Sequence, residues 1–218
     1  MKNRTIIAII LLTLLTTIKS KDEITFSKFN LKKIIIVNNS LIKEEEIKKL
    51  LIPIYNKNLI FLKNTKIEQA LMKNSYIESF YIKKKYPDTL EIKIIEKKPI
   101  AILFSNKKKF YLSEKIDLID FKKIKEYENL PYIFGNKDEF KIFYYELKKI
   151  NFPISQIKKF TLFETKRWDL ETFDNKLIKL PTQNYIKSLE NYLNLINKDI
   201  FKKYKLFDFR ISNQLILK

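Results

Sequence analysis

The chain contains no cysteine and no histidine. Without cysteine there is no disulfide framework and no thiolate zinc site. Without histidine, the usual general base and the commonest metal ligand are both missing. Serine–lysine pairs and carboxylate dyads could still support catalysis, but the two absences make an enzyme the less favoured interpretation. We therefore expect no catalytic residue, no bound metal and no cofactor.

Glycine is nearly absent, with one residue in 218, and basic residues are in excess, with 44 Lys+Arg against 25 Asp+Glu and a net charge of +19. Such a charge suggests nucleic acid, anionic lipid or an acidic partner. The excess is lysine rather than arginine, and it accompanies many Ile, Asn, Phe and Tyr residues, which AT-rich codons specify. We attribute most of the charge to genome composition. Because no RNA-binding aromatic signature or basic heptad helix occurs, we expect no nucleic-acid partner.

An uncharged apolar run covers residues 5–18, with Lys2 and Arg4 before it and Lys19 and Lys21 after it. As a helix it would be about 21 Å long, which is shorter than a hydrocarbon core of roughly 30 Å. The flanking basic side chains could snorkel and widen its span. The run is therefore either a membrane anchor or a cleaved signal peptide. Both alternatives place the remainder outside the cytoplasm, since the positive charge precedes the run.

The remainder divides into two patterned blocks, and no internal repeat or long linker separates them. The first block, residues 29–96, predicts the order strand, helix, helix, strand, strand, which makes a compact α+β unit. Its expected elements are a β-branched strand at 34–37, a helix that begins near residue 44 and ends at Pro53, a helix at 65–73 and strands at 76–84 and 89–96.

The second block, residues 97–218, is rich in short strands and has two amphipathic helices, which predicts a β-rich domain with flanking helices. The helices are expected at 138–150 and 184–197. The strands are expected at 100–104, 109–112, 118–121, 157–163, 167–173, 177–180, 206–211 and 214–217.

Several motifs of the first block resemble those of one family. Tyr86-Pro87-Asp88-Thr89-Leu90-Glu91-Ile92 is similar to the "Y-P-D-T-L-x-I" hairpin in the POTRA module of the FtsQ/DivIB family of bacterial cell division proteins. Glu96-Lys97-Lys98-Pro99-Ile100-Ala101 resembles the "E-R-x-P-x-A" that follows this hairpin in the family. Two further matches are Ile36-Val37-Asn38-Asn39, in which Asn39 stands where a glycine is common, and Asn58-Leu59-Ile60-Phe61.

The second block continues the resemblance in the same order along the chain. Its matches are Leu130-Pro131 with Gly135, Arg167-Trp168-Asp169-Leu170 followed by Lys179-Leu180-Pro181, and Asp208-Phe209-Arg210. Each motif is short, but the ordered set is specific. Other POTRA proteins share some of the motifs, so a protein-export or outer-membrane assembly component is the alternative function. A third class, an exported enzyme or a polyanion-binding protein, lacks any convergent set of residues here.

The resemblance implies a single-pass inner-membrane scaffold of the divisome, located at the division septum and without enzymatic activity. It implies a cytoplasmic tail at 1–4, a transmembrane anchor at 5–21 and a linker at 22–28. A POTRA domain at 29–96 and a C-terminal β domain at 97–218 would follow in the periplasm. The implied partners are FtsB/FtsL-like divisome proteins, with other septal membrane proteins as a further alternative.

The C-terminal strands are the expected partner site. The terminal apolar segment has no later strand in the sequence to cover it, and an open edge invites an added strand. The resemblance adds Lys166 and Arg167, which would face acidic residues of the partner, next to Trp168. A lone tryptophan in a strand is more often core than interface. The predicted partner-binding residues are Lys166, Arg167, Trp168, Ile211, Asn213, Leu215 and Leu217.

Overall fold

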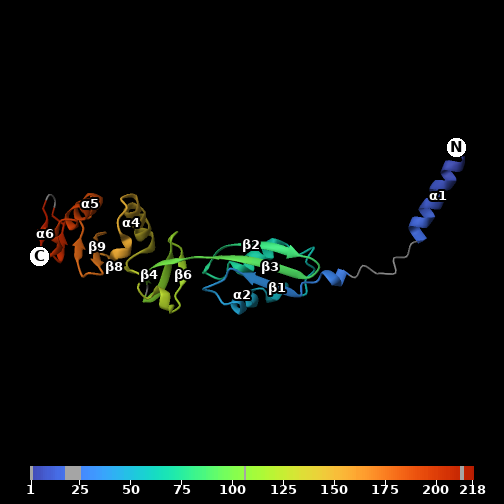
Figure 1. The fold of residues 1–218 in the computed structure, drawn as a ribbon, viewed down its shortest axis with the longest axis horizontal. Helices are drawn as coiled ribbons and strands as arrows, with labels where there is room; N and C mark the ends of the chain where they lie inside the picture. Colours follow the sequence, from blue (N-terminus) through green and yellow to red (C-terminus); the bar gives the residue numbers. More distant parts are fainter. Residues whose placement is uncertain (1, 18–25, 106, 212–213) are drawn as a thin grey trace. The chain divides into compact units, whose positions relative to one another are not determined.

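The computed structural model describes residues 2–17, 26–105, 107–211 and 214–218 (Figure 1). Contacts between residues divide the chain into two compact units. The first unit comprises the chain up to Lys73 together with Phe80–Ile94. The second comprises Asn74–Ser79 and Ile95–Lys218. The division therefore passes through two neighbouring strands, so each unit contains segments that are separated in the sequence.

The apolar run forms helix α1, Lys2–Thr17, which is 16 residues long. The predicted transmembrane anchor at 5–21 is not what the structure has: the helix begins earlier, and residues 18–21 lie outside the described residues. Of the helices in the described ranges, none combines the length and apolar character needed to cross a membrane. The predicted tail at 1–4 stays a prediction, and its residues 2–4 are the first residues of α1.

The predicted linker at 22–28 is only partly described. Its residues 22–25 lie outside the described residues, and a short 3-10 helix, η1, occupies Phe26–Phe29. The chain is therefore already regular before the first strand begins.

The first unit has the predicted order of strand, two helices and two strands. Its sheet has the strand order β1-β3-β2, in which β1 runs parallel to β3 with Ile34 opposite Leu90. Helix α2 packs on β1 and contacts α3. The elements are β1 Lys33–Val37, α2 Glu44–Leu50, the 3-10 turn η2 Ile52–Ile54, α3 Asn64–Leu71, β2 Ile77–Lys85 and β3 Thr89–Glu96.

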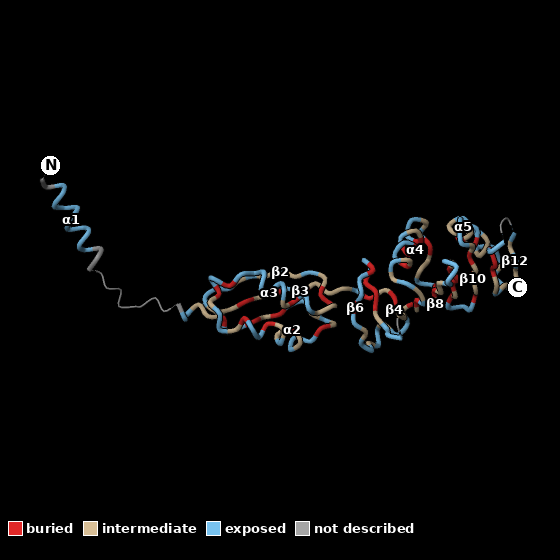
Figure 2. Tube along the Cα trace, turned by 180° about the vertical axis from the view of Figure 1, so that it is seen from behind, coloured by how far each residue is buried: buried red, intermediate tan, exposed pale blue. Residues whose placement is uncertain are grey.

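Strand β3 is central in this sheet and supplies much of its core. Leu90, Ile92 and Ile94 are each fully buried, because a strand turns alternate side chains to the same face. Figure 2 shows the buried stretches of β3 as red segments within the unit. Helices α2 and α3 add Ile47 and Ile67, which are also fully buried. The α+β unit expected from the sequence is therefore confirmed.

Asparagine occupies several positions with a left-handed backbone, a conformation that glycine adopts most easily. Asn38 has φ of 65°, and its side-chain amide donates to the carbonyl of Ile94 at 2.9 Å. We expected Asn39 to stand at the turn position usually held by glycine, so the structure corrects this by one residue. Asparagine tolerates this backbone better than most residues because its short amide can bond locally.

The second unit holds a sheet of nine strands in the order β12-β11-β10-β9-β8-β7-β4-β5-β6. The sequence missed β7 and the short helix α6, and it overestimated the last two strands. The elements are β4 Pro99–Ser105, β5 Lys108–Ser113, β6 Leu118–Asp120, η3 Lys125–Tyr127, β7 Tyr132–Phe134, α4 Lys137–Lys149, η4 Ile154–Gln156, β8 Ile157–Leu162, β9 Trp168–Thr172, β10 Leu177–Lys179, α5 Tyr185–Ile196, α6 Asp199–Lys202, β11 Leu206–Asp208 and β12 Ile216–Leu217.

Helices α4 and α5 cover one face of this sheet, because their buried side chains join the inward side chains of the strands in a single cluster. In Figure 1 both helices lie on the same side of the strands. Asn136 caps α4, since its side-chain oxygen accepts from the backbone N–H of Asp138 at 2.7 Å. The opposite face is polar where Lys159, Asp169 and Lys179 lie on it. Over β4 and β7 it is aromatic instead, since Phe104 packs on Tyr132 and Phe134.

The one glycine of the chain stands where the packing leaves no room for a side chain. A Cβ on Gly135 would approach Cβ of Leu162 to 2.8 Å and the Trp168 ring to 3.3 Å. Gly135 follows β7 directly, so this contact allows β7 to lie close against the β8–β9 pair. Leucine and tryptophan can then fill the space beside it.

We expect Ile92→Ala to lower the free energy of unfolding by about 2–5 kcal/mol, the usual cost of truncating a fully buried aliphatic side chain. The exposed neighbour on the same strand provides the control, and Lys93→Ala should change it by less than about 0.5 kcal/mol. Urea unfolding followed by far-UV circular dichroism measures both values. Equal stabilities of the two variants would contradict the central place of β3.

Candidate functional site

Strand β12 lies at one edge of the nine-stranded sheet and pairs antiparallel with β11. Leu206 and Lys218 exchange both backbone hydrogen bonds, at 2.9 and 3.2 Å. In an antiparallel pair the bonding direction alternates along the strand, so the N–H group of Leu217 points away from β11. The same alternation, carried one residue before β12, gives the N–H group of Leu215 this direction too. These two groups are therefore oriented to bond a further strand. The edge is shorter than predicted, because β11 ends at Asp208 and β12 begins at Ile216.

The side chains at this edge alternate between core and solvent. Leu215 and Leu217 are partly buried against the core, so only part of each is accessible. Ile211 is 50% exposed and Ile216 is 39% exposed. Asn213, also a predicted site residue, lies outside the described residues. Sequence reasoning missed Ile216, although alternation from Leu215 and Leu217 would have placed it on the outer face.

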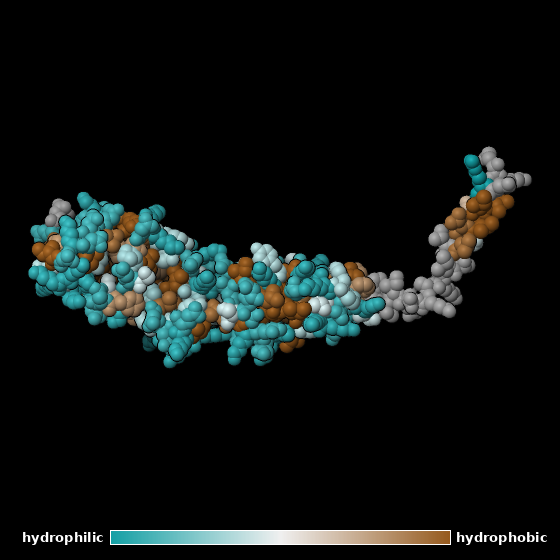
Figure 3. Space-filling view, viewed as in Figure 1, coloured by the Kyte–Doolittle hydropathy of each residue, from teal (hydrophilic) through white to brown (hydrophobic). Residues whose placement is uncertain are grey.

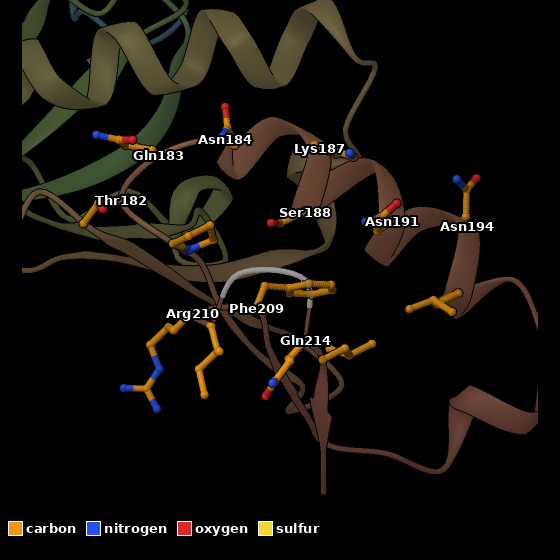
Figure 4. A pocket seen from close by; sticks show the side chains of 14 residues that line it. Thr182, Gln183, Asn184, Lys187, Ser188, Asn191, Asn194, Phe209, Arg210 and Gln214 are labelled. Atoms are coloured by element: carbon orange, nitrogen blue, oxygen red, sulfur yellow. The ribbon is translucent and has the colours of Figure 1, made fainter.

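A groove runs between α5 and the segment on either side of Ile211. Its helix side is polar, and its strand side includes Phe209, Ile211 and Leu215. Figure 4 shows Ser188, Asn191 and Asn194 along α5, with Arg210 directed away from the helix. The groove adjoins the edge strand, so a chain that pairs with β12 could continue into it.

The predicted basic pair lies in the turn between β8 and β9. Lys166 has φ of 62° and forms an ion pair with Glu139 of α4, while its side chain stays 65% exposed. Arg167 is more constrained. Its Nε donates to Oδ1 of Asp169 at 3.1 Å, and its guanidinium lies 4.3 Å from the ring centroid of Phe163.

Trp168 belongs to the core rather than to the surface. Its residue exposure is 5%, and its ring stacks on Phe143 of α4 with centroids 4.9 Å apart. Phe140 of the same helix meets it edge-on. A partner could not reach this ring without unpacking α4, so we withdraw Trp168 from the predicted contact residues.

The basic pair is not adjacent to the terminal edge, as we had expected. Strands β10 and β11 separate β9 from β12, which places them about 14 Å apart at the usual strand spacing. A row of residues in register crosses this distance on the outer face. Asp169 is paired with Lys179, Lys179 with Asp208 and Asp208 with Ile216. We call Asp169, Lys179 and Asp208 the charged row.

Two arginines complete the charged row, one near each end. Arg210 contacts the carboxylate of Asp208 through Nε at 2.8 and 3.0 Å and through Nη2 at 2.6 Å. These hydrogen bonds lower the pKa of Asp208 below its ordinary value of 3.8. At the other end, burial raises the pKa of Asp169 above 3.8, although the hydrogen bond from Arg167 acts in the opposite direction. Of these residues, the sequence placed only Arg167 in the site. It quoted Asp169, Lys179, Asp208 and Arg210 as motif letters but assigned them no part in the site.

This surface combines ion pairs, aliphatic side chains and backbone groups at a strand edge. Within the described ranges, no group of three or more carboxylates is placed to hold a metal ion. The carboxylates of the charged row are held by arginine instead. Asp169 and Asp208 are buried, at 6% and 5% exposure, so the charges that a polypeptide pairing with the strand edge could reach are basic ones such as Arg210.

The comparisons with known proteins point to cell division. The family model described as "POTRA domain, FtsQ-type" matches residues 29–97. "Cell division protein FtsQ" of Rickettsia conorii is 28% identical over 190 residues, which are 85% of this chain and 71% of that protein. The proteins of the same name from Rickettsia felis and Rickettsia prowazekii match with the same identity and coverage.

One solved structure is also similar, at a level too low to support an argument. It is the major extracytoplasmic domain of the trans isomer of the bacterial cell division protein DivIB from Geobacillus stearothermophilus. The likeness covers 47% of this chain and 92% of that one, with 13% identity and a TM-score of 0.32.

The two aspartates of the charged row should affect stability with opposite pH dependence. Asp208 has a lowered pKa, so its contribution is present above pH 3.8 and is lost as the pH falls through its folded-state pKa. Asp169 has a raised pKa, so its contribution is present below pH 3.8 and is lost as the pH rises through its folded-state pKa. Relative to the parent chain, we expect Asp208→Asn to become less stable and Asp169→Asn more stable as the pH rises.

Urea unfolding across about pH 3 to 7, followed by the fluorescence of Trp168, measures both trends. The chain has one tryptophan, and it lies in the same sheet as both aspartates. The same pH trend in both variants would contradict the described environments.

Proposed function

We propose that this chain acts in bacterial cell division as a member of the FtsQ/DivIB family, and that it works there as a binding scaffold rather than as an enzyme. The matches to FtsQ proteins over 85% of the chain support a role in division. The FtsQ-type POTRA match favours this role over export or outer-membrane assembly. We take residues 29–96 as the POTRA domain and 97–218 as the partner-binding domain.

The edge strand β12 is the observation that carries the scaffold proposal. We infer that a segment of an FtsB/FtsL-like protein adds as a strand to this edge. The outward N–H groups of Leu215 and Leu217 would bond its backbone. Because β12 has only two residues, the strand pairing alone is short. The partner therefore also needs side-chain contacts with Ile211, Ile216 and the adjoining groove.

Charge would add selectivity to this contact. Lys166 keeps most of its side chain in solvent, and Arg210 is 43% exposed while it pairs with Asp208. Exposed basic groups steer an acidic partner and raise its association rate more than they raise affinity. We propose that acidic residues of the partner meet Lys166, Arg167 and Arg210 along the charged row.

We further propose that α1 attaches the chain to the inner membrane and that both folded units lie on the periplasmic side. Apolar side chains cover most of the face of α1 that Figure 3 shows. Its exposed side chains include Ile6, Ile9 and Leu12, at 54%, 62% and 65%. Apolar surface of this extent is favourable in lipid and unfavourable in water.

Replacing Leu215 by proline tests the edge-strand site. Proline removes the outward N–H at this position, and it is tolerated because it precedes the first residue of β12. We expect binding of the partner's periplasmic segment to weaken by about tenfold, the effect of one hydrogen bond that is lost on one side. Isothermal titration calorimetry with this segment measures the change.

Leu215→Ala is the matched control, since it shortens the side chain but keeps the N–H. Circular dichroism should show that both variants remain folded. If a folded Leu215→Pro variant binds as tightly as Leu215→Ala, the partner does not pair with this edge, and the POTRA surface becomes the site to examine.

Two charges within α1 test the membrane attachment. A central aspartate costs about 2.5–3.5 kcal/mol in a membrane helix. The double variant Ile10→Asp, Leu11→Asp should therefore leave the membrane fraction, whereas Ile10→Val, Leu11→Ile should stay in it. Flotation of cell membranes on a density gradient makes the measurement. Retention of the charged variant at the parental level would show that attachment does not depend on α1.

A further inference from the structure

Backbone hydrogen bonds join three segments of the first unit: the start of β1, the loop before α3 and the turn between β2 and β3. Leu31 donates to the carbonyl of Lys57 at 2.9 Å, and Leu59 donates to the carbonyl of Phe29 at 2.8 Å. The backbone N–H of Lys32 donates to Asp88 at 2.9 Å. We call these segments, 29–33, 57–63 and 86–88, the proximal end. Figure 1 shows the start of β1 and the turn between β2 and β3 together there.

Large apolar side chains protrude from the proximal end. Phe61 is 70% exposed, Tyr86 is 57% exposed and Ile60 is 42% exposed. A single exposed apolar residue is ordinary. Here two are consecutive at the tip of one loop, and the third lies in the neighbouring turn. Burial within the first unit therefore does not account for this group.

Lysines surround the same tip. A shallow hollow beside Phe61 is lined by Lys57, Lys63 and Lys66, all with exposed side chains. On the neighbouring strand, Lys84 donates to the carbonyl of Leu62 at 2.6 Å, which ties the loop to β2. Two carboxylates lie near the turn of the neighbouring hairpin: Glu91 forms an ion pair with Lys85, and Asp88 accepts from the hydroxyl of Thr89. The lysines outnumber them. The surface is therefore basic around an apolar tip.

The covalent chain keeps this surface near the end of α1. Nine Cα–Cα steps join Thr17 to Phe26, and a fully extended chain of that length reaches about 30 Å. If α1 lies in a membrane, the proximal end cannot move far from the bilayer surface. The local lipid concentration is then high, so even a weak affinity would keep the surface occupied.

We propose that the proximal end rests on an anionic bilayer surface, with Ile60 and Phe61 at the level of the headgroups and Lys57, Lys63 and Lys66 on the phosphates. Aromatic residues favour this level of a membrane, and lysines beside them add attraction to anionic lipid. The inference rests on the proposed attachment through α1. It adds a second point of contact, which restricts the tumbling of the first unit.

The absence of cysteine makes a direct test practical, because one introduced thiol is the only one to be labelled. The full chain carrying Ile60→Cys is labelled with a fluorophore and reconstituted into phosphatidylglycerol vesicles that contain lipid-borne quenchers. The control is Met72→Cys, which is 55% exposed in the same unit. Met72 follows the last residue of α3, about 12 Å along the helix axis from Asn64, the first residue of this helix.

We expect strong quenching at position 60 and weak quenching at position 72. Neutralising Lys63 and Lys66 by glutamine should lower occupancy of the anionic surface by about fivefold for each lysine. Phosphatidylcholine vesicles should give less quenching at position 60 than phosphatidylglycerol vesicles.

Flotation of the same samples separates the two proposals. If the chain does not float with the vesicles, the attachment through α1 fails, and the lipid contact fails with it. If the chain floats but both labels are quenched equally, the lipid contact alone is overturned. Shielding of position 60 only when a division protein is added would assign the tip to a protein partner and would also overturn it.

Discussion

The stacking of Trp168 on Phe143 is the contact on which the candidate site depends. The two rings lie 4.9 Å apart and almost parallel, at 10°, and they join α4 to β9. Once Trp168 faces the helices, the two-residue period of the strand turns Asp169 to the opposite face. Register across the sheet then aligns Lys179, Asp208 and Ile216 with it. The same core that stabilises the unit therefore places the charged row on the face that no helix covers.

A site of this kind needs neither histidine nor cysteine. Its components are backbone groups at an open edge, aliphatic side chains and ion pairs of arginine with aspartate. Such groups recognise a polypeptide by shape, hydrogen bonding and charge. The chain's strong positive charge is consistent with an acidic partner on the second unit and an anionic membrane on the first. Both contacts would be weakened by salt.

The sequence predicted the elements that have strong periodicity, and it failed where local pattern and tertiary packing differ. The alternation through Leu90, Ile92 and Ile94 correctly indicated a buried strand, because a central strand has few alternatives. Strand β7 was missed because its three residues show no alternation, and its place depends on the contact of Gly135 with Trp168. The sequence predicted edge strands that are too long, because apolar residues after Asp208 favour a strand whether or not a neighbouring strand pairs with them. The charged row could not be predicted, since it requires the register between four strands.

The central claim, that this chain works at the site of cell division, is tested most directly by the position of the protein in dividing cells. A fluorescent fusion of the full chain, expressed in place of the native protein, reports this position. Our account predicts a band at the constriction that appears before the daughter cells separate. A uniform distribution around the cell, unchanged as constriction proceeds, would contradict it.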